Sequence, residues 1–500
     1  MKHKKIAEAL GHIDPEYISQ AAEKHKSNWH RFTGAAAAVL AIVLVIGLLL
    51  PALPNNILVS TKPTVEGTIP EDLGMPVCIP SPHTLKLHNL VAAPKYPEMV
   101  SKPNYDAYDN KDAYYKDEKV WLSDQIAHYN QPSGYADSLD SFFAKSIRQF
   151  LAGQTDNAAY SPVNVYMALA MLAETTDGNS RQQILSLLGL DSIEQLRTQV
   201  SHVWNAHYCA DGATTTVLAN SIWLDNSFSY KQASVEQLAN QYFASVFSGD
   251  LGTEEMNEQL RQWIDSQTGG LLEKQTDELK MDPATMFALA STIYFSADWE
   301  DSFSEKNTKQ ALFHTEDVDI KTQFMNQYIS GGTYYWGNGF GAVKLSLSGE
   351  NDMWLILPDE GKTVDDVLAS DEYLQMCSGR WNQRKQYDIH LSLPKFDISS
   401  KTDLSDGIKQ MGVTDIFDSR VSDFSTISDA NLYVGKVEHA VRVAIDEDGC
   451  VAAAYTVALI YATYNPAQNE TIDFVLDRPF LFVITSRDSL PLFAGVVNQP

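Results

Sequence analysis

The sequence predicts an α+β fold in one large domain that follows an N-terminal region of different composition. Apolar residues recur at helical spacing from Leu139 to Leu151, and Val165 to Ala173 continues the helical pattern. Strand-like apolar runs dominate the second half, at residues 217–224, 287–295, 353–358, 387–396, 441–445, 480–485 and 492–497. Helices gathered first and strands later favour an α+β domain over alternating βαβ units.

Composition limits the classes of function. The chain has 500 residues, of which 44% are hydrophobic, so it can bury a large core. Its formal net charge of -27 opposes binding to phosphate backbones, and we therefore expect no nucleic-acid partner. The 4 cysteines lie far apart and form no C-x-x-C pair, so a structural zinc site is not expected.

An apolar segment near the N-terminus predicts a membrane anchor. Gly34 to Leu50 carries no charged side chain, and with its flanks the segment at 33–53 approaches the ~20 residues that span a bilayer. Six Lys or Arg residues precede it, which places residues 1–32 in the cytoplasm as a tail and the rest outside the cell. The alternative is secretion after cleavage, but no clear A-x-A site follows.

Residues 54–137 predict an extracellular stalk. The segment from Pro54 to Pro132 holds ten of the 20 prolines of the chain, which disfavours long helices and central strands. The run from Asn104 to Trp121 shows neither helical nor strand periodicity. We expect a partly extended spacer. The alternative, in which part of the segment packs on the following domain, stays open because the segment contains apolar residues.

No catalytic motif appears. The chain lacks a G-x-S-x-G elbow, an H-E-x-x-H helix and a phosphate-binding P-loop. A hydrolase would need a Ser-His-acid constellation that the sequence does not supply. We therefore expect no enzyme activity, no cofactor and no metal site.

Residues 138–500 resemble the serpin family. The most specific match is FVLDRPFLFVI at 474–484, with Asp477, Pro479 and Phe480 at the fixed positions of the family signature. Further matches follow in the family's order: Asn157, Ser161-Pro162, ALAMLA at 168–173, Asn220 with Trp223, QWIDSQTGG at 262–270, IYFSADW ending at Trp299, LPDEGK at 357–362, LPKF at 393–396, MGVTDIF at 411–417, His439 and PLFAGVVNQP at 491–500.

This resemblance implies the serpin fold: a large, mainly antiparallel sheet, two smaller sheets, about nine helices and an exposed reactive loop. It also implies a mechanism in which a serine protease cleaves the loop and becomes covalently attached to it. The cleaved loop then inserts into the large sheet as a new strand. The implied partner is a serine protease, and we expect the serpin itself to be a monomer.

The reactive loop implied by the resemblance begins with a hinge suited to insertion. Its hinge residues are Glu447, Gly449, Cys450, Ala452, Ala453, Ala454 and Thr456. Both alternating faces from Cys450 to Ala462 are uncharged and contain no proline, so a strand built from them buries no charge. Cys450 and Val451 replace the Thr and Glu that are usual in the family, and both replacements are small or apolar.

The resemblance also identifies a gate where the sheet opens, formed by Ser161, Asn164, Ser291 and His439. In the family this histidine forms hydrogen bonds beneath the opening strands, so its role is in gating and not in catalysis. Asn164 stands where the family usually has Ser, and Ser291 stands where it usually has Asn. These departures put the exact hydrogen-bond network in doubt.

Counting 17 residues from Glu447, as in the family, predicts the reactive bond at Thr463–Tyr464. Ala462 is the alternative for the specificity pocket. Thr or Ala suits an elastase-like protease, whereas Tyr464 suits a chymotrypsin- or subtilisin-like one. A trypsin-like target is not expected, because no Lys or Arg lies between Glu447 and Asp477.

The sequence thus predicts a membrane-anchored suicide inhibitor of extracellular serine proteases, of the inhibitory serpin type. The alternative is a non-inhibitory serpin that acts as a surface binding or sensing module, which the departures at Cys450, Val451 and Ser291 favour.

Overall fold

The computed structural model describes residues 89–210, 215–268, 270, 272, 276, 279–315, 318–450 and 469–500. The chain divides into two compact units, residues 1–72 and 73–500, and all the described residues belong to the second unit. The predicted tail, the predicted span at 33–53 and the first part of the predicted stalk lie outside the described residues. Within the described residues, no helix combines the length and apolar character that crossing a membrane requires.

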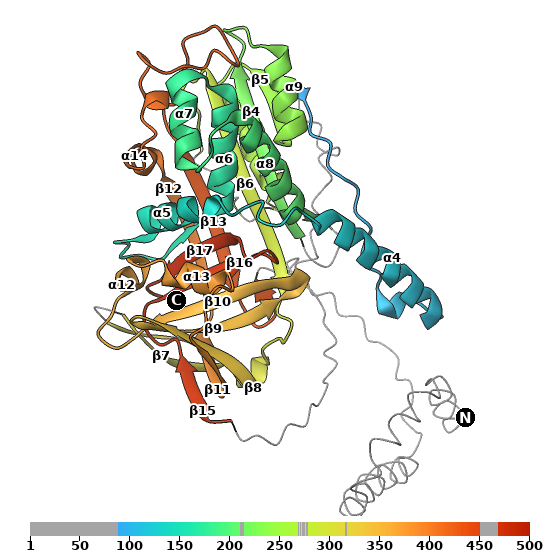
Figure 1. The fold of residues 1–500 in the computed structure, drawn as a ribbon, viewed down its shortest axis with the longest axis vertical. Coiled ribbons are helices and arrows are strands. Elements are labelled where there is room, and N and C mark those ends of the chain that lie inside the picture. The colour runs from blue at the N-terminus through green and yellow to red at the C-terminus, as the bar shows by residue number, and fades with distance from the viewer. Residues whose placement is uncertain are drawn as a thin grey trace, which may run out of the picture. The chain divides into compact units, whose positions relative to one another are not determined.

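An eight-stranded sheet forms the upper part of the domain as drawn in Figure 1. In spatial order its strands are β1 (Leu90–Ala92), β5 (Ala244–Gly249), β4 (Thr215–Asp225), β6 (Phe287–Asp298), β14 (Gly449–Cys450), β13 (Glu438–Ile445) and β12 (Phe396–Asp403), with β3 (Cys209–Ala210) paired to β4. The β4–β5 pair is parallel and the other pairs are antiparallel. This sheet is the predicted large, mainly antiparallel one.

A second sheet of nine strands takes the place of the two smaller sheets that the resemblance implied. Its order is β15 (Thr471–Val475), β11 (Arg384–Pro394), β8 (Asp319–Gly337), β9 (Phe340–Leu347), β10 (Asn351–Pro358), β16 (Phe480–Thr485), β17 (Pro491–Val497) and β2 (Ala158–Tyr160), with β7 (Lys309–His314) paired to β8. The two smaller sheets are continuous because β8 pairs with β11 along most of its length and with β9 at its C-terminal end.

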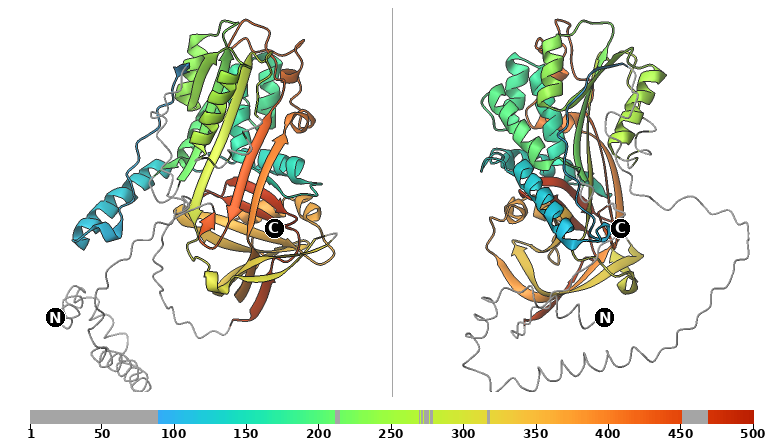
Figure 2. Two further views of the ribbon diagram at one scale, coloured as in Figure 1. Left: turned by 180° about the vertical axis from the view of Figure 1, so that it is seen from behind. Right: turned by 90° about the vertical axis from the view of Figure 1, so that its right-hand side faces the viewer.

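Helices pack against both sheets. They are α5 (Leu139–Leu151), α6 (Pro162–Thr175), α7 (Gly178–Leu187), α8 (Ile193–His207), α9 (Gln232–Gln241), α10 (Glu254–Gln267), α12 (Val364–Leu368), α13 (Glu372–Cys377) and α14 (Ser405–Gln410). Short 3-10 turns occupy Tyr105–Ala107, Glu305–Asn307, Ser348–Glu350 and Asp415–Phe417. Figure 2 shows α6 to α8 on one face and α10 on the other. These nine helices and the two sheets confirm the predicted serpin fold.

Helix α6 lies at the centre of the core, and its sequence explains its start. The Ser161 side chain accepts a hydrogen bond from the Asn164 backbone N–H, and Pro162 occupies the first turn, where its missing N–H costs nothing. Nearly every residue of α6 is buried, polar Asn164 included. A buried amide must find partners, and Asn164 finds them on β6, as described below.

The segment 89–137 contains regular structure and pairs with the large sheet, which is the arrangement that the sequence left open as the alternative to a partly extended spacer. Strand β1 joins the large sheet, and α4 (Lys111–Tyr129) forms a 19-residue helix. The Asn110 side chain caps α4 by accepting a hydrogen bond from the Asp112 backbone N–H. The sequence showed no periodicity because α4 buries no apolar stripe, and Val120 and Ile126 are exposed.

Candidate functional site

The candidate site is the place where the predicted hinge enters the large sheet. Among the described residues, strand β14 comprises Gly449 and Cys450, and it lies between β6 and β13. Gly449 is opposite Asp298 of β6 and Cys450 is opposite Ala297. On the other side Cys450 is opposite Ile445 of β13. The first two residues of the predicted insertion strand therefore already occupy a position in the sheet.

Beyond β14, the described residues of β6 and β13 show no backbone pairing with each other, although both strands continue for most of the length of the sheet. Residues 287–291 of β6 are correspondingly only half-buried. Figure 2 shows β6 and β13 running beside one another from β14 onward. Strand β14 therefore lies between the two strands at this end of the sheet.

A tight turn holds the hinge in place. The Asp446 carboxylate accepts hydrogen bonds from the backbone N–H groups of Asp448 and Gly449, at 3.0 and 3.2 Å. The Trp299 indole donates to the Asp446 carbonyl at 2.9 Å, which ties the turn to the end of β6. Only glycine fits at 449, because an added Cβ would overlap the carbonyl oxygen of Ala297 and the backbone beyond it.

Glu447 anchors the hinge to the body of the domain. The Lys395 ammonium lies 2.5 Å from its carboxylate, and the Thr308 hydroxyl donates to the carboxylate at 2.6 Å. Burial opposes ionisation of Glu447, yet the hydrogen bonds from Lys395 and Thr308 keep its pKa below the ordinary value. Glu447 is therefore a charged, partnered anchor and not an isolated buried acid.

Acidic groups surround this anchor. Burial and the neighbouring Asp448 carboxylate raise the pKa of Asp298, and burial and Asp446 raise the pKa of Asp448. Like charges repel one another here, and the repulsion grows as these carboxylates ionise. The hinge turn is thus held by specific hydrogen bonds against an unfavourable local charge.

Cys450 begins the buried face of the insertion strand. It is 3% exposed, and burial raises the pKa of its thiol to about 12. The thiol is therefore protonated at neutral pH and acts as a small apolar group. Cys450 is the first residue of the face for which the sequence predicts burial.

His439 lies in the gate, near the end of β13 opposite to the one that pairs with Cys450. Its Nε2 atom accepts a hydrogen bond from the Ser161 backbone N–H at 3.0 Å, and the Ser161 hydroxyl donates to the Leu492 carbonyl at 2.7 Å. Burial lowers the pKa of His439 to about 3. The imidazole is therefore neutral, which its acceptor role at Nε2 also requires.

The other half of the gate joins α6 to β6 and β4. The Ser291 hydroxyl contacts the Asn164 side-chain oxygen, and the Asn164 amide donates back to the Ser291 carbonyl at 3.2 Å. The Ser291 hydroxyl also lies 2.8 Å from the Asn220 side-chain oxygen. Asn220 is held in turn by the Tyr242 carbonyl at 2.9 Å.

The structure brings all four predicted gate residues into two adjoining hydrogen-bonded groups, one around Ser161 and one around Asn164, linked at the start of α6. It also places Glu447, Gly449 and Cys450 together. The remaining predicted site residues lie outside the described residues; they are Ala452, Ala453, Ala454, Thr456, Ala462, Thr463 and Tyr464.

Sequence reasoning missed four residues of the site, namely Asn220, Trp299, Thr308 and Lys395. Three of them stood inside motifs that carried the family resemblance, including Trp299 at the end of IYFSADW and Lys395 in LPKF. Their presence in these motifs was a usable signal. Their partners were not predictable, because each contacts another residue of the site that lies between 52 and 147 positions away in the sequence.

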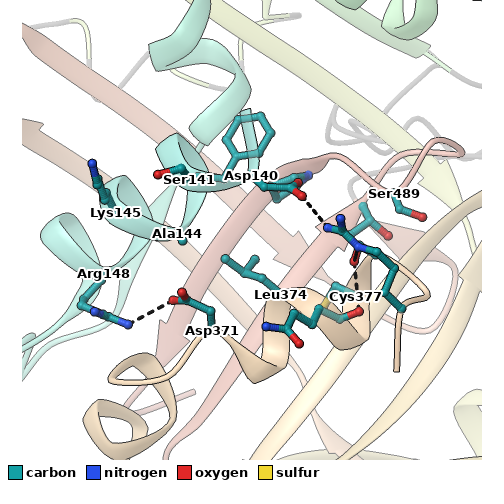
Figure 3. Close-up of a pocket in the computed structure, with 15 residues that line it drawn as sticks. Asp140, Ser141, Ala144, Lys145, Arg148, Asp371, Leu374, Cys377 and Ser489 are labelled. Atoms are coloured by element: carbon teal, nitrogen blue, oxygen red, sulfur yellow. Dashed lines mark hydrogen bonds and ion pairs between the residues drawn. The ribbon is translucent and has the colours of Figure 1, made fainter. Parts of the chain in front are cut away.

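A separate pocket of about 570 Å³ lies between α5 and α13. Figure 3 shows ion pairs linking its two walls, Arg148 with Asp371 at 3.1 Å and Arg380 with Asp140 at 2.5 Å. Leu374 contributes an apolar side chain between them. The pocket is therefore polar at its edges and partly apolar within, and it shares no residue with the hinge or the gate.

Comparison with known proteins agrees with this geometry. Residues 138–500 match the family model described as serpin (serine protease inhibitor). Serpin-ZX of Arabidopsis thaliana is 28% identical over 368 residues, which cover 69% of this chain and 93% of that protein. Leukocyte elastase inhibitor A of Mus musculus is 27% identical over 383 residues, covering 73% of this chain and 99% of that protein.

A solved structure supports the assignment at the level of the fold. The thermophilic serpin tengpin in its native state is 25% identical, with a TM-score of 0.66, and the match covers 74% of this chain and 95% of that one. The residues that the family model matches include the hinge, the gate and the C-terminal signature. The chain therefore belongs to the serpin family.

Proposed function

We propose that this serpin inhibits extracellular serine proteases by inserting its cleaved reactive loop between β6 and β13. The observation that carries the proposal is β14, in which Cys450 already pairs with both neighbouring strands and Gly449 pairs with β6. Each further residue that inserts would gain ladder hydrogen bonds on two sides. Insertion therefore needs no new nucleus, only a loop that is free to follow.

Continuing the register of β14 gives the insertion a defined end point. Extending the pairs Gly449–Asp298 and Cys450–Ile445 in step places Thr456 opposite both Ser291 and His439. Side chains alternate in a strand, so Thr456 shares the buried face of Cys450. Its hydroxyl would then join the polar gate, where the partners of a buried hydroxyl are available.

For the target we propose an elastase-like or chymotrypsin- or subtilisin-like protease that cleaves at Thr463–Tyr464. The support is the side chains at these positions and at Ala462, none of which is basic. A curated relative of this chain is named a leukocyte elastase inhibitor. Inhibition would be kinetic, since the protease is trapped covalently before it completes hydrolysis.

We further propose that residues 33–53 anchor the serpin in the cell membrane, with residues 1–32 inside and the serpin domain outside. The support is the apolar run and the basic residues that precede it. Extraction of cell membranes at alkaline pH tests this arrangement. Release of the full-length chain into the soluble fraction would contradict it, and a shortened chain in the medium would support the alternative of cleavage and secretion.

Inhibition is tested by mixing the purified chain with a panel of elastase-, chymotrypsin- and subtilisin-like proteases and resolving the products on a denaturing gel. We expect an SDS-stable complex with at least one protease. Cys450→Arg should become a substrate that is cleaved without forming the complex, because it would bury a charge between β6 and β13. Cys450→Thr, which restores the usual family residue, is the matched control. No complex with any protease would reject the proposal.

The second candidate function, a non-inhibitory binding module, is favoured by the pocket between α5 and α13. Arg148 and Arg380 border it, and Phe143 lines it. Both arginines are already paired with carboxylates, those of Asp371 and Asp140. The pocket therefore suits a small apolar molecule that packs against Phe143 and Leu374. The candidate gains support if loop cleavage brings no large rise in melting temperature while such a molecule stabilises the chain.

A further inference from the structure

The segment that precedes the family-matched domain is bound along the edge of the large sheet, and we propose that it restrains sheet opening. We define the clasp as residues 89–138. The inference rests on the proposed function, because a restraint on sheet opening matters only if the loop inserts. It adds a regulatory device that the family model, which begins at residue 138, does not contain.

One end of the clasp adds a strand to the sheet. In β1, Leu90 is opposite Phe247 and Ala92 is opposite Val246, both in β5. The Ser248 backbone N–H also donates to the Asn89 carbonyl at 3.0 Å. Within residues 138–500, β5 is the outermost strand of this side of the large sheet. Strand β1, which precedes residue 138, therefore covers its free edge.

The middle of the clasp is fixed by one aromatic side chain. The Tyr96 ring stacks on Trp204 at 5.4 Å and on Tyr208 at 5.5 Å, and it faces Phe243 at 6.3 Å. Trp204 and Tyr208 belong to the end of α8, whereas Phe243 directly precedes β5. Tyr96 therefore joins α8 to the edge of the sheet.

The other end of the clasp is bound elsewhere. The Gln199 amide of α8 donates to the Tyr135 carbonyl at 3.1 Å and to the Ser138 hydroxyl at 2.8 Å. The Tyr135 hydroxyl donates to Asp488 at 3.0 Å, in the turn between β16 and β17. The clasp thus extends from the edge of the large sheet to a turn of the second sheet (Figure 1).

This connection resists insertion. The loop enters between β6 and β13, so the block formed by β6, β4 and β5 must move away from β13. The clasp moves with β5 at one end but is held by Asp488 at the other. Displacement of the block therefore breaks contacts of Tyr96, Tyr135 or β1. The clasp raises the barrier to premature insertion and leaves the final inserted state available.

The test measures spontaneous insertion in the intact, uncleaved chain. Wild type and Tyr96→Ala are incubated at a fixed elevated temperature, and the urea-resistant fraction is followed on urea-gradient gels. Aromatic contacts of this kind are worth about 0.5–1.5 kcal/mol, so conversion should be roughly three- to tenfold faster in the variant. Tyr115→Ala, which removes an exposed tyrosine from α4, is the matched control and should convert at the wild-type rate.

A variant with an added disulfide tests the same inference, because it should slow the conversion that Tyr96→Ala accelerates. Ala92→Cys combined with Val246→Cys places two thiols at paired positions of β1 and β5. The oxidised form should convert more slowly than wild type, and reductant should restore the wild-type rate. This variant decides the question if Tyr96→Ala does not fold.

The outcomes separate the clasp from the proposed function. Wild type cleaved in the loop serves as the reference for the inserted state. One outcome is that cleaved wild type becomes urea-resistant while Tyr96→Ala and the oxidised cysteine variant convert at the wild-type rate. That result would reject the restraint by the clasp and would leave the proposal of loop insertion supported. If cleaved wild type gains no urea resistance, insertion itself fails, and the clasp fails with it.

Discussion

The Ser291 hydroxyl of β6 and the Asn164 side chain of α6 form a direct hydrogen-bonded contact across 127 positions of sequence. The family usually has Ser at the position of Asn164 and Asn at the position of Ser291. The two departures therefore exchange the partners and keep one hydroxyl and one amide in the gate. The sequence left the hydrogen-bond network at these two positions in doubt, and in the structure the two side chains are each other's partners.

We expect this pair to be energetically coupled. Asn164→Ser alone and Ser291→Asn alone should each lower the unfolding midpoint, since each leaves a buried polar group poorly paired, at a cost of about 1–3 kcal/mol. The double variant should recover part of the loss, with a coupling energy of roughly 0.5 kcal/mol or more. A double-mutant cycle by denaturant unfolding measures this. Strictly additive losses would show that the contact carries no coupling.

His439 should make the stability of the native state depend on pH. Its pKa is about 3 in the folded state and near 6.5 when unfolded, so the unfolded chain binds an extra proton between these values. Stability contributed by neutral His439 is thus full above pH 6.5 and falls by roughly 1.4 kcal/mol per pH unit below it.

The His439→Gln variant tests this dependence by thermal unfolding at pH 7.5 and 5.0. Glutamine keeps an acceptor for the Ser161 N–H but does not titrate, so the variant should lose less stability on acidification than wild type. His390→Gln, at an exposed histidine of β11, serves as the control. Equal pH dependence in wild type and His439→Gln would show that the imidazole does not remain neutral in the folded state.

The Lys395–Glu447 ion pair should stabilise the hinge at neutral pH. The folded-state pKa of Glu447 is lowered, so its contribution is present above the ordinary carboxylate pKa and is lost as the pH falls through the folded value. Lys395→Met leaves the carboxylate buried beside Thr308 only. We expect a lower unfolding midpoint at pH 7, with the difference from wild type shrinking toward pH 4. Lys401→Met, at an exposed lysine of β12, is a control that should change neither the unfolding midpoint at pH 7 nor its dependence on pH.

The predicted reactive bond leads to a specificity switch. Thr463→Arg should give the serpin a complex with a trypsin-like protease that wild type does not form, because trypsin-like pockets select a basic side chain. Mass spectrometry of the fragment released by a wild-type target protease checks the position directly. A cut at Ala462–Thr463 would support the alternative register, and a cut outside 462–465 would contradict both.

Local sequence was sufficient for most of the secondary structure and for the family. Each of the seven predicted strand runs lies largely or wholly within an observed strand, because alternating or continuous apolar runs depend on neighbours in the chain. Helix α5 followed from its apolar periodicity in the same way. By contrast, α4 escaped detection because its apolar residues do not fall on one face.

Sequence by itself determined that this chain is a serpin and that the segment after Gly449 is uncharged and free of proline, since both depend only on residue types at fixed spacing. Tertiary structure decided how these residues act together. It paired Asn164 with Ser291 and Lys395 with Glu447, and it set β1 and Tyr96 against the sheet. Such contacts join residues that only the packing of the whole core brings together, so the local periodicity of the sequence cannot predict them.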